Sequence, residues 1–389
     1  MNHLSSSIRK SLLFIVLISL SLLVLACEPK LRKPGGEMDT PEHHVYSGMR
    51  LLGENNYGQA QREFELALQL APRHSQAHAG LALVKAYQGD HPGAAAAMKE
   101  AWKEAKTKED KLFVHVGRIR LLTMGKAESD WLEGARAELD GAVKLDPRHA
   151  AAYYYMGLAY KTALAFDDAG RMFKQVLDIN KDYVKEANGE WNLVQKIQRA
   201  MPGTITGKKI ALLEVIGRAD AAALFMEELK IDTLYKKRTL KTFDTSFKDP
   251  EKSGNKPAKA MLPGDVADHP LRADVEGILG IGVRGLETYP DGSFHPNEPV
   301  NRAAYAMMVE DILIKVTGDN ALATKFIGQV SPFPDLRSDL PYFNAALTLT
   351  SRGMMEAKNF TSGEFAPLRP VSGVEALLVI RKFKEELKF

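Results

Sequence analysis

The stretch YPDGSFHPNEPVNRAAYAMMV carries the side chains whose spacing most resembles a metal site. Polar side chains alternate at Asp291, Ser293, His295 and Asn297, as they do in a calcium-binding loop. Such a loop needs a bidentate Glu at its twelfth position, and counting from Asp291 places the cation Arg302 there. We therefore predict no calcium site and interpret the Gly, Phe and Pro of this stretch as turn residues.

The histidines do not form a recognisable ligand set either. His74 and His78 are four positions apart, but His74 follows a Pro-Arg pair that ends a helix, so the two are not expected to share one helical face. HExxH, GxSxG, Walker and paired-Cys motifs do not occur. We predict no metal, no cofactor and no enzymatic activity. The alternative is an enzyme of an envelope polymer, for which Asp291 would have to pair with a second acid in a cleft.

The N-terminus carries an export signal. Arg9 and Lys10 precede the apolar run SLLFIVLISLSLLVLA, which is short for a full membrane span and ends at Cys27, the one cysteine. The segment Val24-Leu25-Ala26-Cys27 resembles a bacterial lipobox, which implies removal of residues 1–26 and acylation of Cys27 by palmitate-type chains. The alternative is an uncleaved transmembrane anchor. Residues 27–40 are polar and rich in Pro and Gly, as is typical of a flexible tether.

Residues 41–187 contain about four copies of one pattern. In each copy an Ala is followed four positions later by a large apolar residue, at Ala60 and Phe64, Ala94 and Met98, Ala135 and Leu139, and Ala169 and Phe173. Successive alanines are 34, 41 and 34 positions apart. A 34-residue period of paired helices resembles the tetratricopeptide (TPR) repeat. The third copy carries extra residues near KEAKTKEDK or GKAESD.

A TPR solenoid exposes first-helix side chains on its inner face, where extended or helical segments of other proteins bind. Tyr154, within a run of three tyrosines, is a candidate peptide anchor, with core packing as the alternative. The basic residues that we predict to line this groove would favour an acidic partner; they are Lys85, Arg118, Arg120 and Lys161. The alternative for each of them is a solvated surface charge.

Residues 188–386 contain a second kind of repeat. DHPLRADVEGILGIGVRGLETYPDGSFHP parallels DLPYFNAALTLTSRGMMEAKNFTSGEFAP, and both precede an apolar helix. This arrangement resembles the S-layer homology (SLH) domain, which usually has three helix-loop-helix units. The units are predicted at about 188–230, 267–316 and 333–385 and are called SLH units one to three. A basic insertion at 235–266 separates the first two.

The SLH resemblance also implies a ligand site. An Arg in the first turn of a helix lies beside exposed N–H donors and can bind an anion, such as an acidic cell-wall sugar. Arg218 and Arg302 keep this residue, whereas Gly373 replaces it in unit three. The aromatic residues expected in the first helices are Trp191 and Tyr342. The alternative for both arginines is a structural role.

Together these patterns predict an all-α protein, with a TPR helical-hairpin solenoid followed by an α-helical SLH-like module of three units. We predict a lipid-anchored envelope scaffold, most simply at the outer membrane facing the periplasm, that binds a protein through the TPR groove and cell-wall polysaccharide or peptidoglycan through the SLH module. The alternative is an assembly factor for pilus, secretion or polysaccharide-export machinery with a purely structural SLH module. The net charge of +3 is too small to imply nucleic acid as a partner.

Overall fold

The computed structural model describes residues 32–126, 129–238, 262–359 and 361–388. The predicted signal peptide, Cys27 and most of the predicted insertion lie outside them. Within the described residues the chain is all-α, as predicted, with sixteen α-helices and no β-strand. The helices are α2 (Pro41–Gly53), α3 (Tyr57–Leu70), α4 (Ser75–Tyr87), α5 (His91–Glu104), α6 (Lys108–Gly125), α7 (Trp131–Leu145), α8 (Ala150–Thr162), α9 (Phe166–Ile179), α10 (Val184–Ala200), α11 (Ile205–Ile210), α12 (Arg218–Ala223), α13 (Ile231–Arg238), α14 (Arg272–Ile281), α15 (Arg302–Thr317), α16 (Phe343–Ser351) and α17 (Gly373–Glu386). A π-helical turn, η1 (Leu224–Glu228), continues α12, and the 3-10 turns η2 (Gly264–Val266) and η3 (Asn320–Thr324) lie in loops.

The chain divides into two compact parts. The N-terminal part comprises the residues up to Thr162 together with Asp178–Tyr183, and the C-terminal part comprises Ala163–Leu177 and the residues from Val184 onward. The division therefore falls within the predicted fourth TPR repeat.

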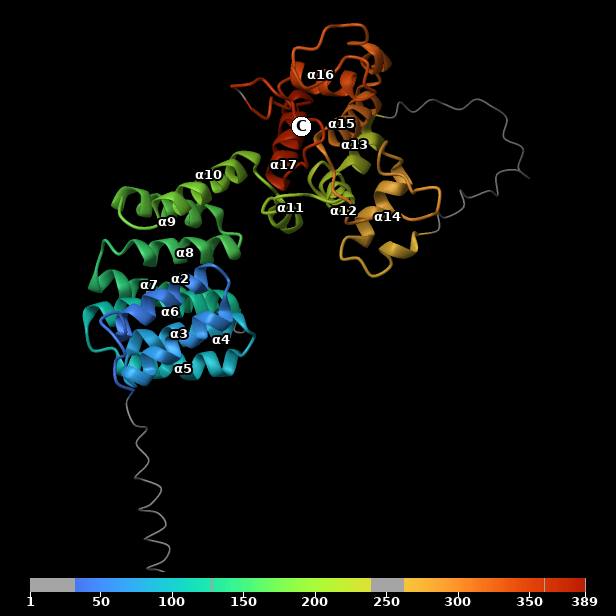
Figure 1. Ribbon diagram of the computed structural model, residues 1–389. Helices are drawn as coiled ribbons and strands as arrows, with labels where there is room; N and C mark the ends of the chain where they lie inside the picture. The colour runs from blue at the N-terminus through green and yellow to red at the C-terminus, as the bar shows by residue number, and fades with distance from the viewer. Residues whose placement is uncertain (1–31, 127–128, 239–261, 360, 389) are drawn as a thin grey trace, which may run out of the picture. The chain divides into compact units, whose positions relative to one another are not determined.

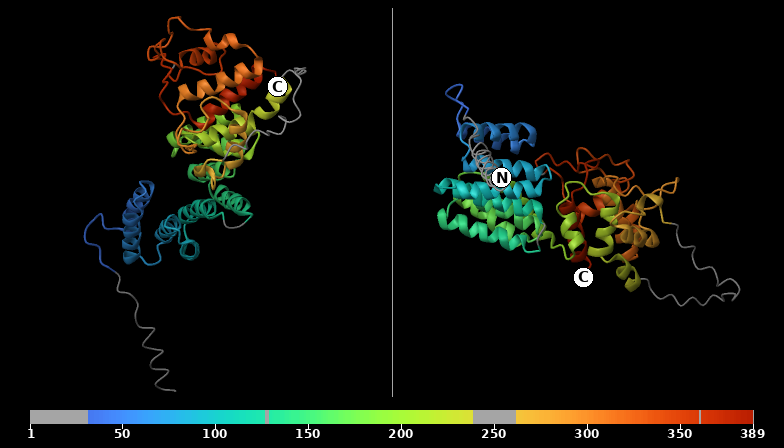
Figure 2. Two further views of the ribbon diagram at one scale, coloured as in Figure 1. Left: turned by 90° about the vertical axis from the view of Figure 1, so that its right-hand side faces the viewer. Right: turned by 90° about the horizontal axis from the view of Figure 1, so that it is seen from below.

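The N-terminal part is a stack of helix pairs. The helices α2 and α3, α4 and α5, and α6 and α7 pack as hairpins, and the first helices α2, α4, α6 and α8 contact one another in order. Figure 1 and Figure 2 show these helices side by side, coloured from blue to green. This is the repeated helix-pair arrangement that the 34-residue period predicts.

Close helix crossing explains the repeated residues. Ala60 and Phe64 of α3 are fully buried, and the Phe64 ring lies against Gly48 of α2 and Gly80 of α4. A Cβ at Gly48 would lie 2.7 Å from Phe64 Cε1, and one at Gly80 would overlap the same ring. One large side chain therefore fills the space between two first helices, and both of them need glycine there.

Residues 32–40, predicted to belong to a flexible tether, form a turn on the N-terminal part. Arg32 N–H donates to the Gln69 carbonyl at 3.1 Å, and the Arg32 side chain pairs with Asp39. His44 Nε2 lies 2.8 Å from the Asp39 carboxylate. The hydrogen bond from Gly35 N–H and the contact with His44 lower the pKa of Asp39 to about 2.

The C-terminal part is organised around a closed ring of three backbone hydrogen bonds. Val300 N–H donates to Ile216 O, Val371 N–H donates to Val300 O, and Ile216 N–H donates to Val371 O, at 3.0, 2.9 and 3.0 Å. All three side chains are buried. Each residue directly precedes the cap and second helix of one predicted SLH unit, namely α12, α15 or α17. Through these three hydrogen bonds the units are joined in a cycle, with unit one bonded to unit two, unit two to unit three, and unit three to unit one.

The helices follow the same cyclic order. Helix α14 of unit two packs on α12 of unit one, α16 of unit three packs on α15 of unit two, and α10 and α11 of unit one pack on α17 of unit three. Figure 2 shows the yellow, orange and red elements of this part gathered into one cluster. The second helices of units one and two therefore start against the loop of the next unit, whereas that of unit three starts against the end of α11.

Candidate functional site

The two PDGSFHP-type loops of the C-terminal part have the same internal geometry. Phe294 and Phe365 are fully buried, and the next residues, His295 and Ala366, have left-handed backbone conformations with φ of 55° and 56°. A carboxylate that precedes each loop in the chain accepts two backbone N–H groups of the loop; in unit two it comes from the end of the predicted insertion. In unit three, Asp335 accepts from Phe365 N–H at 2.8 Å and Ala366 N–H at 2.6 Å. Asp265 does the same at Phe294 and His295 in unit two.

Arg218, at the start of α12, holds the loop of unit two. Its guanidinium donates to three backbone carbonyls, those of Phe294 at 2.8 Å and of Gly285 and Glu287 at 2.7 Å each. The charge also lies 4.8 Å from the centroid of the Phe294 ring, which favours it further. The side chain is buried.

Arg302, at the start of α15, holds the loop of unit three in the same way. Nε donates to Phe365 O at 2.7 Å, Nη2 donates to Glu356 O at 2.6 Å, and Nη1 pairs with the Glu375 carboxylate. Only 2% of Arg302 is exposed. Both arginines thus have carbonyl acceptors within the protein, so the geometry favours the structural alternative over direct binding of an anion.

A cavity of about 840 Å³ lies next to Arg302, between α10, the loop 353–358 and α17. Its lining carries six basic and three acidic side chains, which are Lys196, Arg199, Arg302, Lys358, Arg381 and Lys382, and Glu356, Glu375 and Glu385. Carboxylate or phosphate groups of a ligand would therefore be attracted to it.

Two of these cations are open to a ligand. Lys196 and Arg199 lie one turn apart on α10, and neither has a carboxylate within ion-pair distance among the described residues. Lys358 contacts Glu375 at 2.8 Å and shares that carboxylate with Arg302. Partial burial, together with the nearby charge of Arg302, lowers the pKa of Lys358. An anionic ligand would relieve this repulsion.

The predicted aromatic ligands lie elsewhere. Trp191 is half-buried in α10, and Tyr342 directly precedes α16. Neither lines the cavity. Of its six cations, only Arg302 was predicted from the sequence, although the charged run RKFKEE of α17 contains two of the others.

The predicted TPR groove contains one unusual cation. Arg120 of α6 is only 9% exposed, and its Nε has no hydrogen-bond partner among the described residues. Its guanidinium lies 4.6 Å from the centroid of the Tyr155 ring of α8. Tyr154 stacks on Tyr183 at 4.8 Å, and Tyr155 meets Tyr183 edge-on. A buried cation without an acceptor, next to clustered aromatic rings, is suited to a carboxylate.

The other predicted groove residues are dispersed. Lys85 lies in the last turn of α4, 3.6 Å from Asp90, and Lys161 is half-buried in the last turn of α8. Arg118 faces the second helices instead, because it pairs with Glu138 of α7 at 2.9 Å and lies over Trp102 of α5. The structure thus places Arg118 and Arg120 on different sides of α6.

No group of three or more His, Cys, Asp or Glu side chains in the described ranges has the geometry to hold a metal ion. In the same ranges, none of the helices combines the length and apolarity of a membrane span. The acids of DGSFHPNE act within the loop, where Asp291 accepts from Ser293 N–H at 2.9 Å.

Comparison with known proteins supports the SLH assignment in one segment of the chain. Residues 286–306 match the family model of the S-layer homology domain, over the loop and helix start of unit two. None of the curated proteins is similar enough to count as a match. Among solved structures, one described as YrrB, a TPR protein with an unusual peptide-binding site, is 15% identical and matches 40% of this chain and 93% of its own, with a TM-score of 0.19. The SLH match lies in the C-terminal part, and an SLH segment indicates association with the cell envelope.

Proposed function

We propose that this protein is a lipid-anchored scaffold of the cell envelope that contacts cell-wall glycan through its C-terminal part and a protein through its TPR groove. The observation that carries the wall-binding proposal is the cavity beside Arg302, because it lies next to the SLH segment and six basic side chains line it. The ligand chemistry is a polymer with carboxylate or phosphate groups. In this proposal Arg218 and Arg302 shape the loops, and Lys196, Arg199 and Lys358 contact the ligand.

Co-sedimentation of the mature chain with purified cell walls tests this assignment. Reversing two open charges in Lys196→Glu with Arg199→Glu is expected to weaken wall binding at least about tenfold, because attraction to the anionic polymer becomes repulsion. Binding should fall with added salt, and as pH rises through the lowered pKa of Lys358.

The matched control reverses two exposed lysines of the same part that do not line the cavity, Lys209→Glu with Lys325→Glu. This control should sediment like the wild type. An equal loss of wall binding in both double variants would mean that net charge alone causes the effect, and it would contradict the assignment of the cavity as the binding site. If the wild-type chain does not sediment at all, the alternative of an assembly factor with a structural SLH module is favoured, and the loop-holding roles of Arg218 and Arg302 already agree with it.

The lipid anchor is a separate part of the proposal and rests on the segment Val24–Cys27. Several acyl chains at Cys27 would make attachment effectively stable, since each buried CH₂ contributes about 0.8 kcal/mol. Cys27→Ser is expected to abolish labelling by radioactive palmitate and to leave the signal peptide in place. Fractionation of the labelled wild type tests the proposed outer-membrane location, and recovery in the inner membrane would contradict it.

The protein-binding site of the proposal is the cluster of Arg120 and the tyrosines of α8. A photo-cross-linking amino acid at position 154 should give a discrete adduct with a cell-envelope protein. Arg120→Gln is expected to remove most of that adduct, because the buried guanidinium is the group that lacks an acceptor. Arg73→Gln, at a mostly exposed arginine, serves as the control. An adduct of equal yield in both variants would exclude Arg120 from the site.

A further inference from the structure

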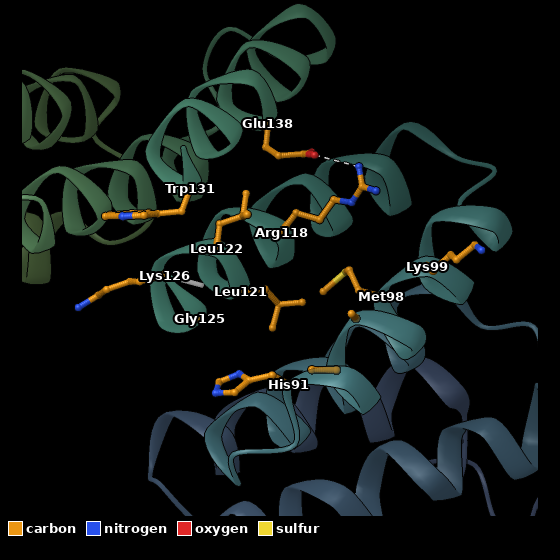
Figure 3. Close-up of a pocket in the computed structure, with 12 residues that line it drawn as sticks. His91, Met98, Lys99, Arg118, Leu121, Leu122, Gly125, Lys126, Trp131 and Glu138 are labelled. Atoms are coloured by element: carbon orange, nitrogen blue, oxygen red, sulfur yellow. Dashed lines mark hydrogen bonds and ion pairs between the residues drawn. The ribbon is translucent and has the colours of Figure 1, made fainter. Parts of the chain in front are cut away.

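A second hollow in the N-terminal part lies between the second helices α5 and α7, with α6 as its floor. Its volume is about 360 Å³, at the lower end of the range of about 300–1,000 Å³ that is typical of ligand pockets. Met98, Leu121 and Leu122 give it an apolar centre. Figure 3 shows Met98 and His91 on α5, Leu121 and Leu122 on α6, and Trp131 on α7 around the same space.

The irregular third repeat forms this hollow. From Gly117 to Ala135 the chain spans 18 positions, whereas the equivalent step from Gly48 to Ala60 spans 12. Helix α6 accordingly has 18 residues, against 13 in α2, α4 and α8. The lengthened stretch supplies Leu121, Leu122, Gly125, Lys126 and Trp131 to the lining, so the insertion provides much of the wall.

The rim of the hollow is basic. Lys99, Lys126 and His91 are exposed, and no carboxylate lies within ion-pair distance of them in the described ranges. Among the described residues, the one acid of the lining is Glu138, and its two oxygens are occupied by Arg118 at 2.9 Å and His115 at 2.7 Å. An apolar centre with a positive rim complements an apolar group that is flanked by negative charge.

We propose that this hollow is a second peptide-binding site, which takes one bulky apolar side chain of a partner and pairs Lys99 and Lys126 with acidic residues on either side of it. A volume of this size suits one large side chain of an extended segment and its neighbours, rather than the surface of a folded domain. The site is separate from the TPR groove, because neither α4 nor α8 contributes to its lining.

Fluorescence anisotropy on the mature chain, with labelled twelve-residue peptides, tests the proposal. Each peptide has a central Trp or Leu, and three matched sets flank it with Asp and Glu, with Ser, or with Lys. We expect binding in the order acidic, neutral, basic. Lys99→Glu with Lys126→Glu should invert this order, whereas Lys144→Glu with Lys181→Glu, two exposed lysines outside the lining, should preserve it.

Filling the hollow provides an independent test. Ala95 is exposed on α5 and lines the hollow, so Ala95→Trp should fill it without disturbing the core and weaken acidic peptides at least about tenfold. Ala96 is equally exposed but outside the lining, so Ala96→Trp is the matched control. Loss of binding in Ala95→Trp but not in Ala96→Trp separates the site from the groove, because neither residue lies on a groove helix. Equal affinities of the two Trp variants, or no preference for acidic flanks, would overturn the proposal.

Discussion

Replacing Arg302 by Met is expected to lower the free energy of unfolding of the C-terminal part by about 3–5 kcal/mol, the typical cost of removing one partner from a buried ion pair. Glu375 would keep only Lys358 as its partner, and the carbonyls of Phe365 and Glu356 would lose their donors. Hydrogen exchange can measure this locally. Backbone amides of the loop 354–371 should exchange about 100-fold faster or more, because each 1.4 kcal/mol is a factor of ten.

Arg369→Met is the matched control for this prediction. Arg369 is exposed, and its side chain makes no hydrogen bond or ion pair in the described ranges, so its replacement should leave exchange within about twofold of the wild type. Arg302→Lys should fall between the two variants, since an ammonium cannot serve two carbonyls and a carboxylate in the planar geometry of a guanidinium. Unchanged protection in Arg302→Met would show that the loop is held by Asp335 and the Phe365 ring alone.

This prediction also affects how wall binding should be tested. A substitution at Arg302 that abolished wall binding would not identify a ligand contact, because it would also release the loop beside the cavity. Substitutions at Lys196 and Arg199 avoid this ambiguity, since both side chains are exposed on α10 and hold no loop.

The sequence was sufficient to predict the helix pairs and the shared loop pattern of units two and three, because these signals are local. The period of Ala60, Ala94 and Ala135 follows from close crossing of helices adjacent in the chain. Phe294 and Phe365 follow the same loop pattern and have the same buried position. These features depend on residues within about one repeat of each other.

The site was not predictable in the same way. An Arg in the first turn of a helix, beside free N–H groups, is compatible with an anion site and with a structural role. Which of the two roles it has depends on the backbone carbonyls that lie within hydrogen-bond distance of it. Those approaching Arg302 come from Phe365 and Glu356, more than 50 positions away. The cavity likewise combines Lys196 of unit one with Lys358 and Arg381 of unit three. Only the cyclic packing of the units brings these residues together.

The role of Gly373 also depends on packing between units. Its replacement is the second substitution for which we expect a large effect. It takes the place of Arg218 and Arg302 at the start of α17, and its neighbour is the end of α11. Unit one has only the short stretch 211–216 between its helices, so it offers no loop for an arginine to hold. Instead the backbone of α11 approaches directly, and a Cβ at Gly373 would overlap the carbonyl oxygen of Ile210.

Gly373→Ala is therefore expected to lower the free energy of unfolding by about 3 kcal/mol, the upper end of the usual cost of overpacking, because the overlapping atom is backbone and cannot rotate away. Gly373→Arg, which restores the residue of the other two units, should destabilise more. Gly189→Ala is the matched control, since Gly189 lies within α10 with no atom near its missing Cβ, and alanine there should stabilise by about 0.5–1 kcal/mol. Urea unfolding followed by Trp191 fluorescence, in a Trp102→Phe, Trp131→Phe background, reports on the C-terminal part. A Gly373→Arg chain as stable as the wild type would mean that α17 does not close the ring against α11, and unit three would then be free to hold an anion at its helix start.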